Sequence, residues 1–318
     1  MKKLITFIAF VLVTYTANAQ TKVINATRDI NNAKKDKFIG SKSTALVELT
    51  PEFINAISKY DYFYAFSDGY AVVQKNDKWG YIDTKGKEVI PTNIEADCVG
   101  RFSEGLAIVA PQVYGEQGGF YVIDHSGKTV FRGKRDLFFD ACGEGIGVDG
   151  IPYFINGLLY VPIIDESANS EQSYKYDVYD KQGNRTGTVD YEIALNYYKN
   201  HETGVYTIFS KQHNDRYDDA DYENDYRDMT YGLKDLSGNV VLAADYDEIN
   251  GKTEGTVKVS NGVVFVILHE YDEEQDGPDG RIAFHYGYAD LKGNDTFTKA
   301  IKDKCRISKE AGKINRDY

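Results

Sequence analysis

Short runs of alternating hydrophobic and polar residues, separated by glycine-containing turns, dominate the chain after about residue 60. One such segment is K-W-G-Y-I-D-T-K-G-K-E-V-I-P, from Lys78 to Pro91, in which two alternating runs flank Asp83-Thr-Lys-Gly86. A period of two is typical of a half-buried β-strand. Asp and Gly three positions apart between two such runs favour a tight turn. The segment therefore predicts a β-hairpin.

This hairpin pattern occurs five times along the chain. The turn begins with aspartate and ends with glycine at Asp83 and Gly86, Asp124 and Gly127, Asp180 and Gly183, Asp235 and Gly238, and Asp290 and Gly293. The residue four positions before each aspartate is aromatic: Trp79, Phe120, Tyr176, Tyr231 and Tyr286. An opening Asp accepts a backbone N–H, and Gly adopts the positive φ that the return strand needs. Five aligned copies predict a tandem repeat array whose aromatic residues lie in the core.

A further short strand, led by glycine, is expected before each hairpin. The leading glycines are Gly69, Gly105, Gly157, Gly204 and Gly255. From these glycines to the hairpin aromatic residues the intervals are 10, 15, 19, 27 and 31 residues, which grow steadily along the chain. In the first, fourth and fifth copies Gly80, Gly232 and Gly287 follow the aromatic residue and leave room for a neighbouring backbone.

The expected fold is all-β, with tandem antiparallel meanders of three to four strands stacked as a propeller-like or an open, curved array. We expect five repeats over residues 61–298, after a polar segment and short helix over residues 20–60. Thr50 and Pro51 predict the start of that helix, which runs to Lys59. A basic tail is expected over residues 299–318.

The first 19 residues have the pattern of a secretory signal. Lys2 and Lys3 precede an apolar run over Leu4–Val13, and Ala17-Asn-Ala19 suits cleavage before Gln20. The run is too short to span a bilayer. We therefore expect an exported protein, periplasmic, secreted or at the cell surface, without a transmembrane segment. Cys98, Cys142 and Cys305 allow one disulfide, and their spacing fits no zinc site.

The formal net charge of −12 disfavours nucleic acid as a partner. Two insertions concentrate this charge: Lys211–Met229 contains seven carboxylates against three basic residues, and Glu270–Gly280 contains six against none. Exposed tyrosines beside them would anchor a partner or a sugar. The candidate binding residues are Tyr217, Asp219, Asp221, Tyr222, Glu223, Asp225, Tyr226 and Tyr271. Calcium at the acidic insertions, and core packing for any one tyrosine, are the alternatives.

An enzyme would need a recognisable nucleophile, acid–base pair or metal site. The five histidines show no H-E-x-x-H spacing, and the chain contains no G-x-S-x-G, S-x-x-K or Walker motif. We therefore expect no enzyme activity, no catalytic residues, no resident metal and no cofactor. A hydrolase remains the least favoured alternative.

The segments Phe66–Pro91 and Phe102–Phe131, which contain F-S-E-G-L-A-I-V and K-W-G-Y-I-D-T-K-G-K-E-V-I-P, resemble the WG repeat of exported bacterial proteins. The resemblance weakens after about residue 150. It implies a β-rich interaction scaffold and transfers no catalytic residues. We expect the protein to bind a protein or an envelope component through its acidic, Tyr-rich insertions, with glycan binding as the alternative.

Overall fold

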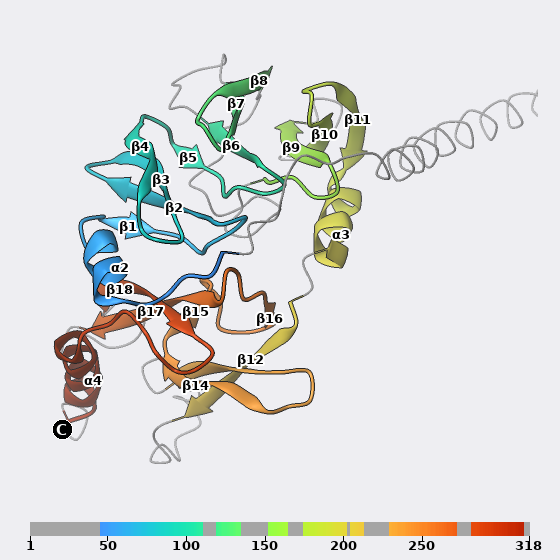
Figure 1. The fold of residues 1–318 in the computed structure, drawn as a ribbon. Coiled ribbons are helices and arrows are strands. Elements are labelled where there is room, and N and C mark those ends of the chain that lie inside the picture. Colours follow the sequence, from blue (N-terminus) through green and yellow to red (C-terminus); the bar gives the residue numbers. More distant parts are fainter. Residues whose placement is uncertain are drawn as a thin grey trace, which may run out of the picture. The chain divides into compact units, whose positions relative to one another are not determined.

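The chain forms five separate antiparallel sheets in the part that the structure describes, and each sheet contains one of the five hairpins (Figure 1). The computed structural model describes residues 45–110, 119–134, 152–164, 174–201, 204–212, 229–271 and 281–314. Among these residues no sheet closes into a barrel, because each has a linear strand order of three or four strands. The predicted all-β fold of antiparallel meanders is confirmed.

We name the sheets A to E in chain order. Sheet A contains β1 (Tyr62–Phe63), β2 (Tyr70–Lys75), β3 (Lys78–Asp83) and β4 (Glu88–Ile94). Sheet B contains β5 (Cys98–Val99), β6 (Leu106–Ala110), β7 (Gly119–Asp124) and β8 (Thr129–Lys134). Sheet C contains β9 (Leu158–Ile164), β10 (Tyr174–Asp180) and β11 (Arg185–Asp190). Sheet D contains β12 (Tyr206–Gln212), β13 (Met229–Lys234), β14 (Val240–Tyr246) and β16 (Thr256–Val257). Sheet E contains β15 (Glu248–Ile249), β17 (Val263–Tyr271) and β18 (Arg281–Asp290).

Three helices accompany the sheets in the described residues. Helix α2 (Pro51–Ile57) starts as predicted, because Thr50 Oγ1 accepts the N–H of Phe53 at 3.2 Å. Helices α3 (Tyr191–His201) and α4 (Lys299–Ile314) were not predicted. Their sequences are mixed polar and apolar, and tertiary packing supplies what a weak helical pattern lacks. The basic tail is thus helical over most of its length.

All five predicted turns have the same hydrogen bonds. In the first, Asp83 Oδ1 accepts the N–H groups of Lys85 and Lys87 at 2.9 and 3.0 Å, and Gly86 has a φ of +75°. The other four carboxylates make the equivalent bonds at 2.8–3.1 Å: Asp124, Asp180, Asp235 and Asp290. The local chemistry of Asp-x-x-Gly therefore determines the hairpin in every repeat.

The hairpin aromatic residues lie in the core, as predicted, in four of the five repeats. Trp79, Phe120, Tyr176 and Tyr231 are buried, whereas Tyr286 is half-buried. A β-carbon at Gly80 would lie 2.6 Å from the carbonyl oxygen of Ile90, in the outer strand β4. The glycine after the tryptophan is therefore required by the close approach of the fourth strand.

A second turn precedes the hairpin in four repeats. In the first repeat Asp68 and Gly69 both have positive φ, 56° and 87°, between the bridged residues Ser67 and Tyr70. Two consecutive positive φ angles define a type I′ turn, which Asp, Asn and Gly favour. The equivalent turns lie at Glu104-Gly105, Asn156-Gly157 and Asn261-Gly262.

The predicted start of the fifth repeat at Gly255 is wrong. Gly255 precedes β16, which pairs with β12 of sheet D, whereas the first long strand of sheet E follows Gly262. The interval to Tyr286 is therefore 24 residues instead of 31, shorter than the 27 of the fourth repeat. Both glycines have φ near +85° and precede valine-containing runs, so the local pattern does not distinguish them.

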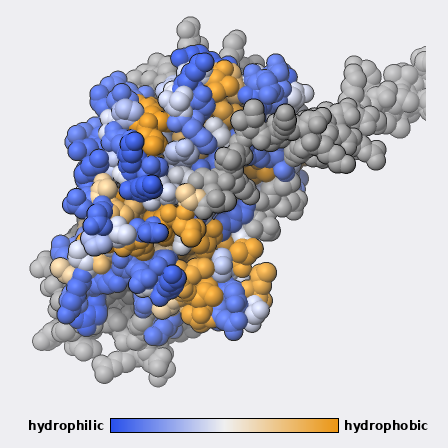
Figure 2. Space-filling view, viewed as in Figure 1, coloured by the Kyte–Doolittle hydropathy of each residue, from blue (hydrophilic) through white to orange (hydrophobic). Residues whose placement is uncertain are grey.

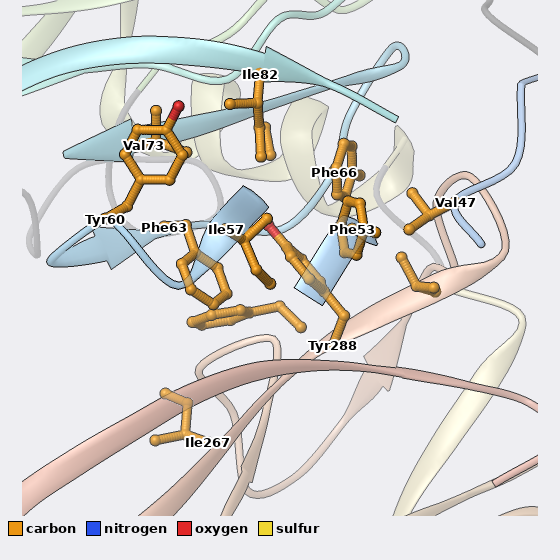
Figure 3. Close-up of a cluster of buried hydrophobic side chains, with 13 residues drawn as sticks. Val47, Phe53, Ile57, Tyr60, Phe63, Phe66, Val73, Ile82, Ile267 and Tyr288 are labelled. Atoms are coloured by element: carbon orange, nitrogen blue, oxygen red, sulfur yellow. The ribbon is translucent and has the colours of Figure 1, made fainter. Parts of the chain in front are cut away.

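Neighbouring sheets share buried cores. Described clusters join sheet A to B, B to C, D to E, and E to A, but none contains residues of both C and D. Strand β17 is buried on both faces, since Val263, Phe265 and Ile267 contact sheet A and the alternate residues contact sheet D. Figure 3 shows the A–E core, with Phe53, Phe63, Phe66 and Tyr288 close together.

The junction between the last and first repeats has the same bonds as the junction between the first and second. The hydroxyl of Tyr81 donates to the carbonyl of Gly100 at 2.8 Å, and that of Tyr288 donates to the carbonyl of Tyr64 at 2.6 Å. Both tyrosines lie two residues before the turn aspartate, and both acceptors follow the first short strand of the next sheet. The fifth repeat therefore packs on the first as one consecutive repeat packs on another.

The type I′ turns form a second set of bonds between repeats. Asp68 Oδ2 accepts the N–H of Gly105 at 2.7 Å, and Asn261 Oδ1 accepts the N–H of Gly69 at 3.2 Å. The carboxylate of Glu104 likewise accepts from Gly157 at 2.8 Å. The residue before the glycine therefore needs an acceptor side chain as well as a tolerance for positive φ.

Of the three cysteines, Cys98 is disulfide-bonded, and Cys305 is a buried thiol on α4. Cys142 lies outside the described residues. One disulfide agrees with the number that the sequence allows.

Candidate functional site

Most of the predicted binding residues belong to the fourth repeat's insertion. Tyr217, Asp219, Asp221, Tyr222, Glu223, Asp225 and Tyr226 lie outside the described residues, so their role stays a prediction. The same is true of the acidic segment after Tyr271. The described ends of both insertions are strands, β12 and β13 in one case and β17 and β18 in the other.

Tyr271 is not an exposed aromatic residue, and its assignment as an exposed anchor is corrected. Strand β17 continues to Tyr271, whose side chain is only 2% exposed. Its hydroxyl lies 3.3 Å from Nδ1 of His269, two residues earlier on the same strand face. Core packing, the alternative interpretation, describes this residue, because the hairpin β17–β18 extends further than the sequence pattern indicated.

Five other aromatic residues form a continuous strip where the first and fifth repeats meet. We call it the aromatic strip, and it consists of Trp79, Tyr64, Tyr62, Tyr286 and Phe284. The Tyr62 ring lies 4.5 Å from both Tyr64 and Tyr286, centroid to centroid and nearly perpendicular to each. Tyr64 stacks on Trp79 at 6.0 Å, and Phe284 lies parallel to Tyr286 at 6.5 Å. The strip therefore crosses from sheet E to sheet A.

Exposure increases along the strip toward Phe284. Trp79 is buried, and its Nε1 donates to the carbonyl of Ala96 at 3.0 Å. Tyr62, Tyr64 and Tyr286 are half-buried, and Phe284 is 43% exposed. An aromatic ring that is this accessible beside half-buried tyrosines is typical of a binding surface, because such rings provide large contact areas with little conformational freedom to lose.

The period of two along β1 places the tyrosines in the strip. In the segment Tyr62-Phe63-Tyr64, the central Phe63 points into the A–E core and the flanking tyrosines point the other way. The same alternation in β18 separates Phe284 and Tyr286 from His285. The sequence contained this signal in its Tyr-Phe-Tyr and Phe-His-Tyr runs, but the fusion of the two runs required the packing of sheet E on sheet A.

A histidine and a carboxylate lie at the sheet E end of the strip. Nε2 of His269 is 2.9 Å from Oε1 of Glu248, and the ring of His269 is perpendicular to that of Phe284 at 4.9 Å. Burial, and then the negative charge of Glu248, raise the pKa of the Tyr286 hydroxyl above its ordinary value. Tyr286 therefore stays a neutral hydrogen-bonding group at physiological pH.

The opposite face of the hairpin is bound to helix α4. Glu270 accepts from Lys304 of α4 at 2.8 Å and lies 3.0 Å from Nε2 of His285. The Lys304 ammonium lowers the pKa of the Glu270 carboxyl, burial opposes this, and His285 adds to the lowering. The basic tail thus contacts the first residue of the late acidic insertion.

Sheet E lacks the outer strand that sheets A, B, C and D have. In those sheets the strand that ends in the turn aspartate pairs with a fourth strand, β4, β8, β11 or β14. After Gly293 the chain instead makes a single bridge, between Asp295 and Ala289, and then enters α4. A β-carbon at Gly287 would meet the side chains of Phe297 and Thr296, at 2.6 and 2.7 Å, instead of strand backbone.

This arrangement offers binding chemistry. The strip supplies ring faces, ring edges and tyrosine hydroxyls, and the neighbouring carboxylates supply negative charge. Across the residues that the structure describes, no group of three or more His, Cys, Asp or Glu side chains is arranged to hold a metal ion. The expectation of no cofactor, and of calcium as an alternative at the acidic insertions, stays a prediction.

Structural comparisons find only distant similarity. A eukaryotic initiation factor has 8% identity and a TM-score of 0.28, with 73% of this chain and 52% of that chain covered. The uncharacterized protein lmo1340 of Listeria monocytogenes EGD-e has 11% identity and a TM-score of 0.27, with 74% and 64% covered. A tricorn protease has 10% identity and a TM-score of 0.25, with 73% and 22% covered. The chain thus spans between about a fifth and two thirds of these proteins' lengths, and the scores are too low to assign a shared fold.

Sequence comparison is more specific. No curated protein matches the chain. The family model described as WG containing repeat matches residues 56–79, 79–110 and 231–262. The first two segments agree with the predicted resemblance, and the third contains the fourth hairpin, which the sequence alone indicated only weakly. The matched segments include the Trp79 and Tyr231 strands and the turn at Glu104-Gly105. The chain is a WG-repeat protein.

Proposed function

We propose that this protein is an exported, non-enzymatic repeat scaffold that binds a protein or an envelope component. The observation that carries the proposal is the aromatic strip, where an exposed Phe284 continues into half-buried tyrosines of two repeats. The acidic insertion Glu270–Gly280 is covalently joined to the strands that carry this strip. Aromatic anchors beside negative charge suit a partner with apolar and basic groups.

Two features support export. The N-terminal sequence has the charge, apolar run and small-residue site of a secretory signal. The disulfide at Cys98 suits an oxidising compartment, since disulfides persist there and are rare in the cytosol. In addition, none of the described helices has the length and apolar character needed to cross a bilayer. Cell fractionation with a reducing and a non-reducing gel tests both export and the disulfide.

A pull-down from envelope extract tests the binding role. The bait is the chain from Gln20 onward, compared with Phe284→Ala and with a variant in which residues 213–228 are replaced by a Gly-Ser linker of equal length. We expect Phe284→Ala to reduce capture about tenfold, because an aromatic anchor contributes about 1–2 kcal/mol. The linker variant is expected to reduce capture if both insertions contact the partner.

Leu236→Ala provides the matched control. Leu236 is an exposed aliphatic residue, 82% accessible, at the tip of the β13–β14 hairpin, where Figure 2 shows hydrophobic residues at the surface. Its truncation removes a similar apolar area outside the aromatic strip. Equal capture by wild type, Phe284→Ala and Leu236→Ala would contradict the proposal that the strip binds.

Glycan binding is the second candidate function. The rings of Phe284 and Tyr286 are parallel within 7°, and aromatic faces in this arrangement stack on sugar rings. Binding to cell-wall polysaccharide that disappears in Phe284→Ala and Tyr286→Ala, with no protein captured from the extract, would favour this function over protein binding. A hydrolase would in addition release soluble sugar from that polysaccharide.

A further inference from the structure

The strongest unassigned feature is the vacant fourth-strand position of sheet E. Strands β3, β7, β10 and β13 each pair with an outer strand, whereas the sheet that contains β18 ends at β18 in the described residues. Only residues 295–297 lie along its C-terminal end, where Thr296 donates its N–H to the carbonyl of Tyr288 at 3.1 Å. The strand is ten residues long, so most of its edge extends beyond this contact.

The bonds to Thr296 establish which backbone groups face the vacant position. Both the N–H and the C=O of Tyr288 point away from β17, since both bond to Thr296. In an antiparallel strand this orientation recurs at every second residue. The backbone groups of Tyr286, and of alternate residues toward Arg281, therefore point the same way, and their side chains lie on the face of the aromatic strip.

We infer that the edge of β18 receives an extended segment of a partner protein as the fourth strand of sheet E. This inference rests on the proposed binding function and specifies its mode. Main-chain hydrogen bonds would supply affinity, and alternate side chains of the added strand would contact the aromatic strip. The other face of the added strand would lie beside His285 and Glu270.

The partner strand is apolar at alternate positions and carries basic residues. The chain's net charge is −12, and the segment that joins β17 to β18 contains only acidic and neutral residues. Glu270 is already paired with Lys304, so the remaining acidic residues of that segment determine the preference. A second copy of this chain is disfavoured as the occupant, because edge-to-edge pairing would bring two acidic segments close together.

A peptide from the chain itself provides the probe. Residues 127–134, G-K-T-V-F-R-G-K, contain the outer strand of sheet B and carry three basic residues. We expect a fluorescein-labelled peptide of this sequence to bind the full chain saturably, and to bind several-fold more weakly when salt rises from low to about 0.5 M. The matched peptide with Val130→Pro loses a backbone donor and is expected to bind at least about tenfold more weakly.

Hydrogen exchange identifies the binding site without any change to the protein. Saturating peptide is expected to slow amide exchange over residues 281–287 and leave the β13–β14 hairpin unchanged. Phe284→Ala is expected to weaken peptide binding about tenfold, whereas Leu236→Ala leaves it unchanged. Absence of peptide binding, or protection confined to other segments, or equal binding of the proline peptide, would overturn the inference.

These outcomes are separable from those of the proposed function. Capture of an envelope partner that depends on Phe284, together with no protection of β18 by peptide or partner, retains the scaffold function and overturns strand addition. Self-association that increases with concentration and protects residues 281–287 would instead assign the edge to a second copy.

Discussion

The first and fifth repeats contain the same hairpin and differ in what covers it. Both have the Asp-x-x-Gly turn with two carboxylate bonds, and both donate a buried tyrosine hydroxyl to the next repeat. In the first repeat β4 pairs with β3, Trp79 opposite Ile94, and Trp79 is buried. In the fifth repeat Phe297 and then α4 follow the turn, and Tyr286 is half-buried.

This difference separates two levels of control. The turn depends on residues within five positions of one another, so it is the same in every copy. The outer strand depends on a further run of residues after the turn, E-V-I-P-T-N-I in the first repeat and D-T-F-T-K-A-I in the fifth. Without the second run, the same hairpin leaves an aromatic residue half-exposed and a strand edge beside it. A binding surface therefore arises from what one repeat omits.

The largest expected difference between the two repeats concerns the glycine after the aromatic residue. Gly80→Ala would place a β-carbon 2.6–2.9 Å from three backbone atoms of β4, and we expect a loss of about 3 kcal/mol in the free energy of unfolding. Gly287→Ala would meet side chains of Phe297 and Thr296, which can move, and we expect a loss of about 1 kcal/mol. Denaturant unfolding of both variants measures the difference.

Equal losses in these two variants would contradict the view that the fifth repeat lacks outer-strand backbone at this position. Gly105→Ala is not a suitable control, because its φ of +86° adds strain of its own. Gly187→Ala is suitable, since a β-carbon there meets nothing within 4 Å and the residue lies in the outer strand β11. We expect it to change the free energy of unfolding by less than about 0.5 kcal/mol.

The second prediction concerns the junctions that the two repeats share. Tyr81→Phe and Tyr288→Phe each remove a hydroxyl and leave a buried carbonyl without this donor, on Gly100 and Tyr64 respectively. We expect each to lower the free energy of unfolding by about 1–2 kcal/mol, because an abandoned buried acceptor retains its desolvation penalty. Similar values would support equivalent junctions. A negligible effect for Tyr288→Phe alone would indicate that the last repeat packs differently on the first.

The smallest expected effect concerns the ion pair that only the fifth repeat has. Lys304→Met removes the partner that lowers the pKa of Glu270. Because a depressed carboxyl pKa stabilises the fold above the unfolded pKa, the contribution is complete at pH 7 and disappears as the pH falls through the folded pKa, below about 4.5. Lys304 is 63% exposed, so we expect a loss of about 0.5 kcal/mol at pH 7 and almost none at pH 3.

Arg306→Met, on the same helix, is the control for Lys304→Met. Arg306 lies 3.9 Å from Asp303, which is on α4 itself, so its removal does not affect the contact between the helix and the hairpin. A loss at pH 7 that persists unchanged at pH 3 in Lys304→Met would show that the side chain contributes through packing instead of charge.

The repeat array was predictable to the residue where local chemistry determines it. Asp83 and its four equivalents, their glycines, and the cap of α2 by Thr50 are as the sequence indicates. The fifth leading glycine was misplaced, because Gly255 and Gly262 share the same local pattern and only strand pairing distinguishes them. Tyr271 was assigned to the surface for the same reason, since strand length beyond the hydrophobic run is decided by the partner strand β18.

By itself, the sequence determined five hairpins and their turns, because each turn is made by an aspartate and a glycine that need only their own backbone neighbours. The tertiary structure decided everything that joins residues distant along the chain: the packing of the fifth repeat on the first, the aromatic strip from Trp79 to Phe284, and the missing outer strand of sheet E. Hydrophobic contact is non-directional and many pairings bury similar areas, so the choice among them depends on the assembled whole.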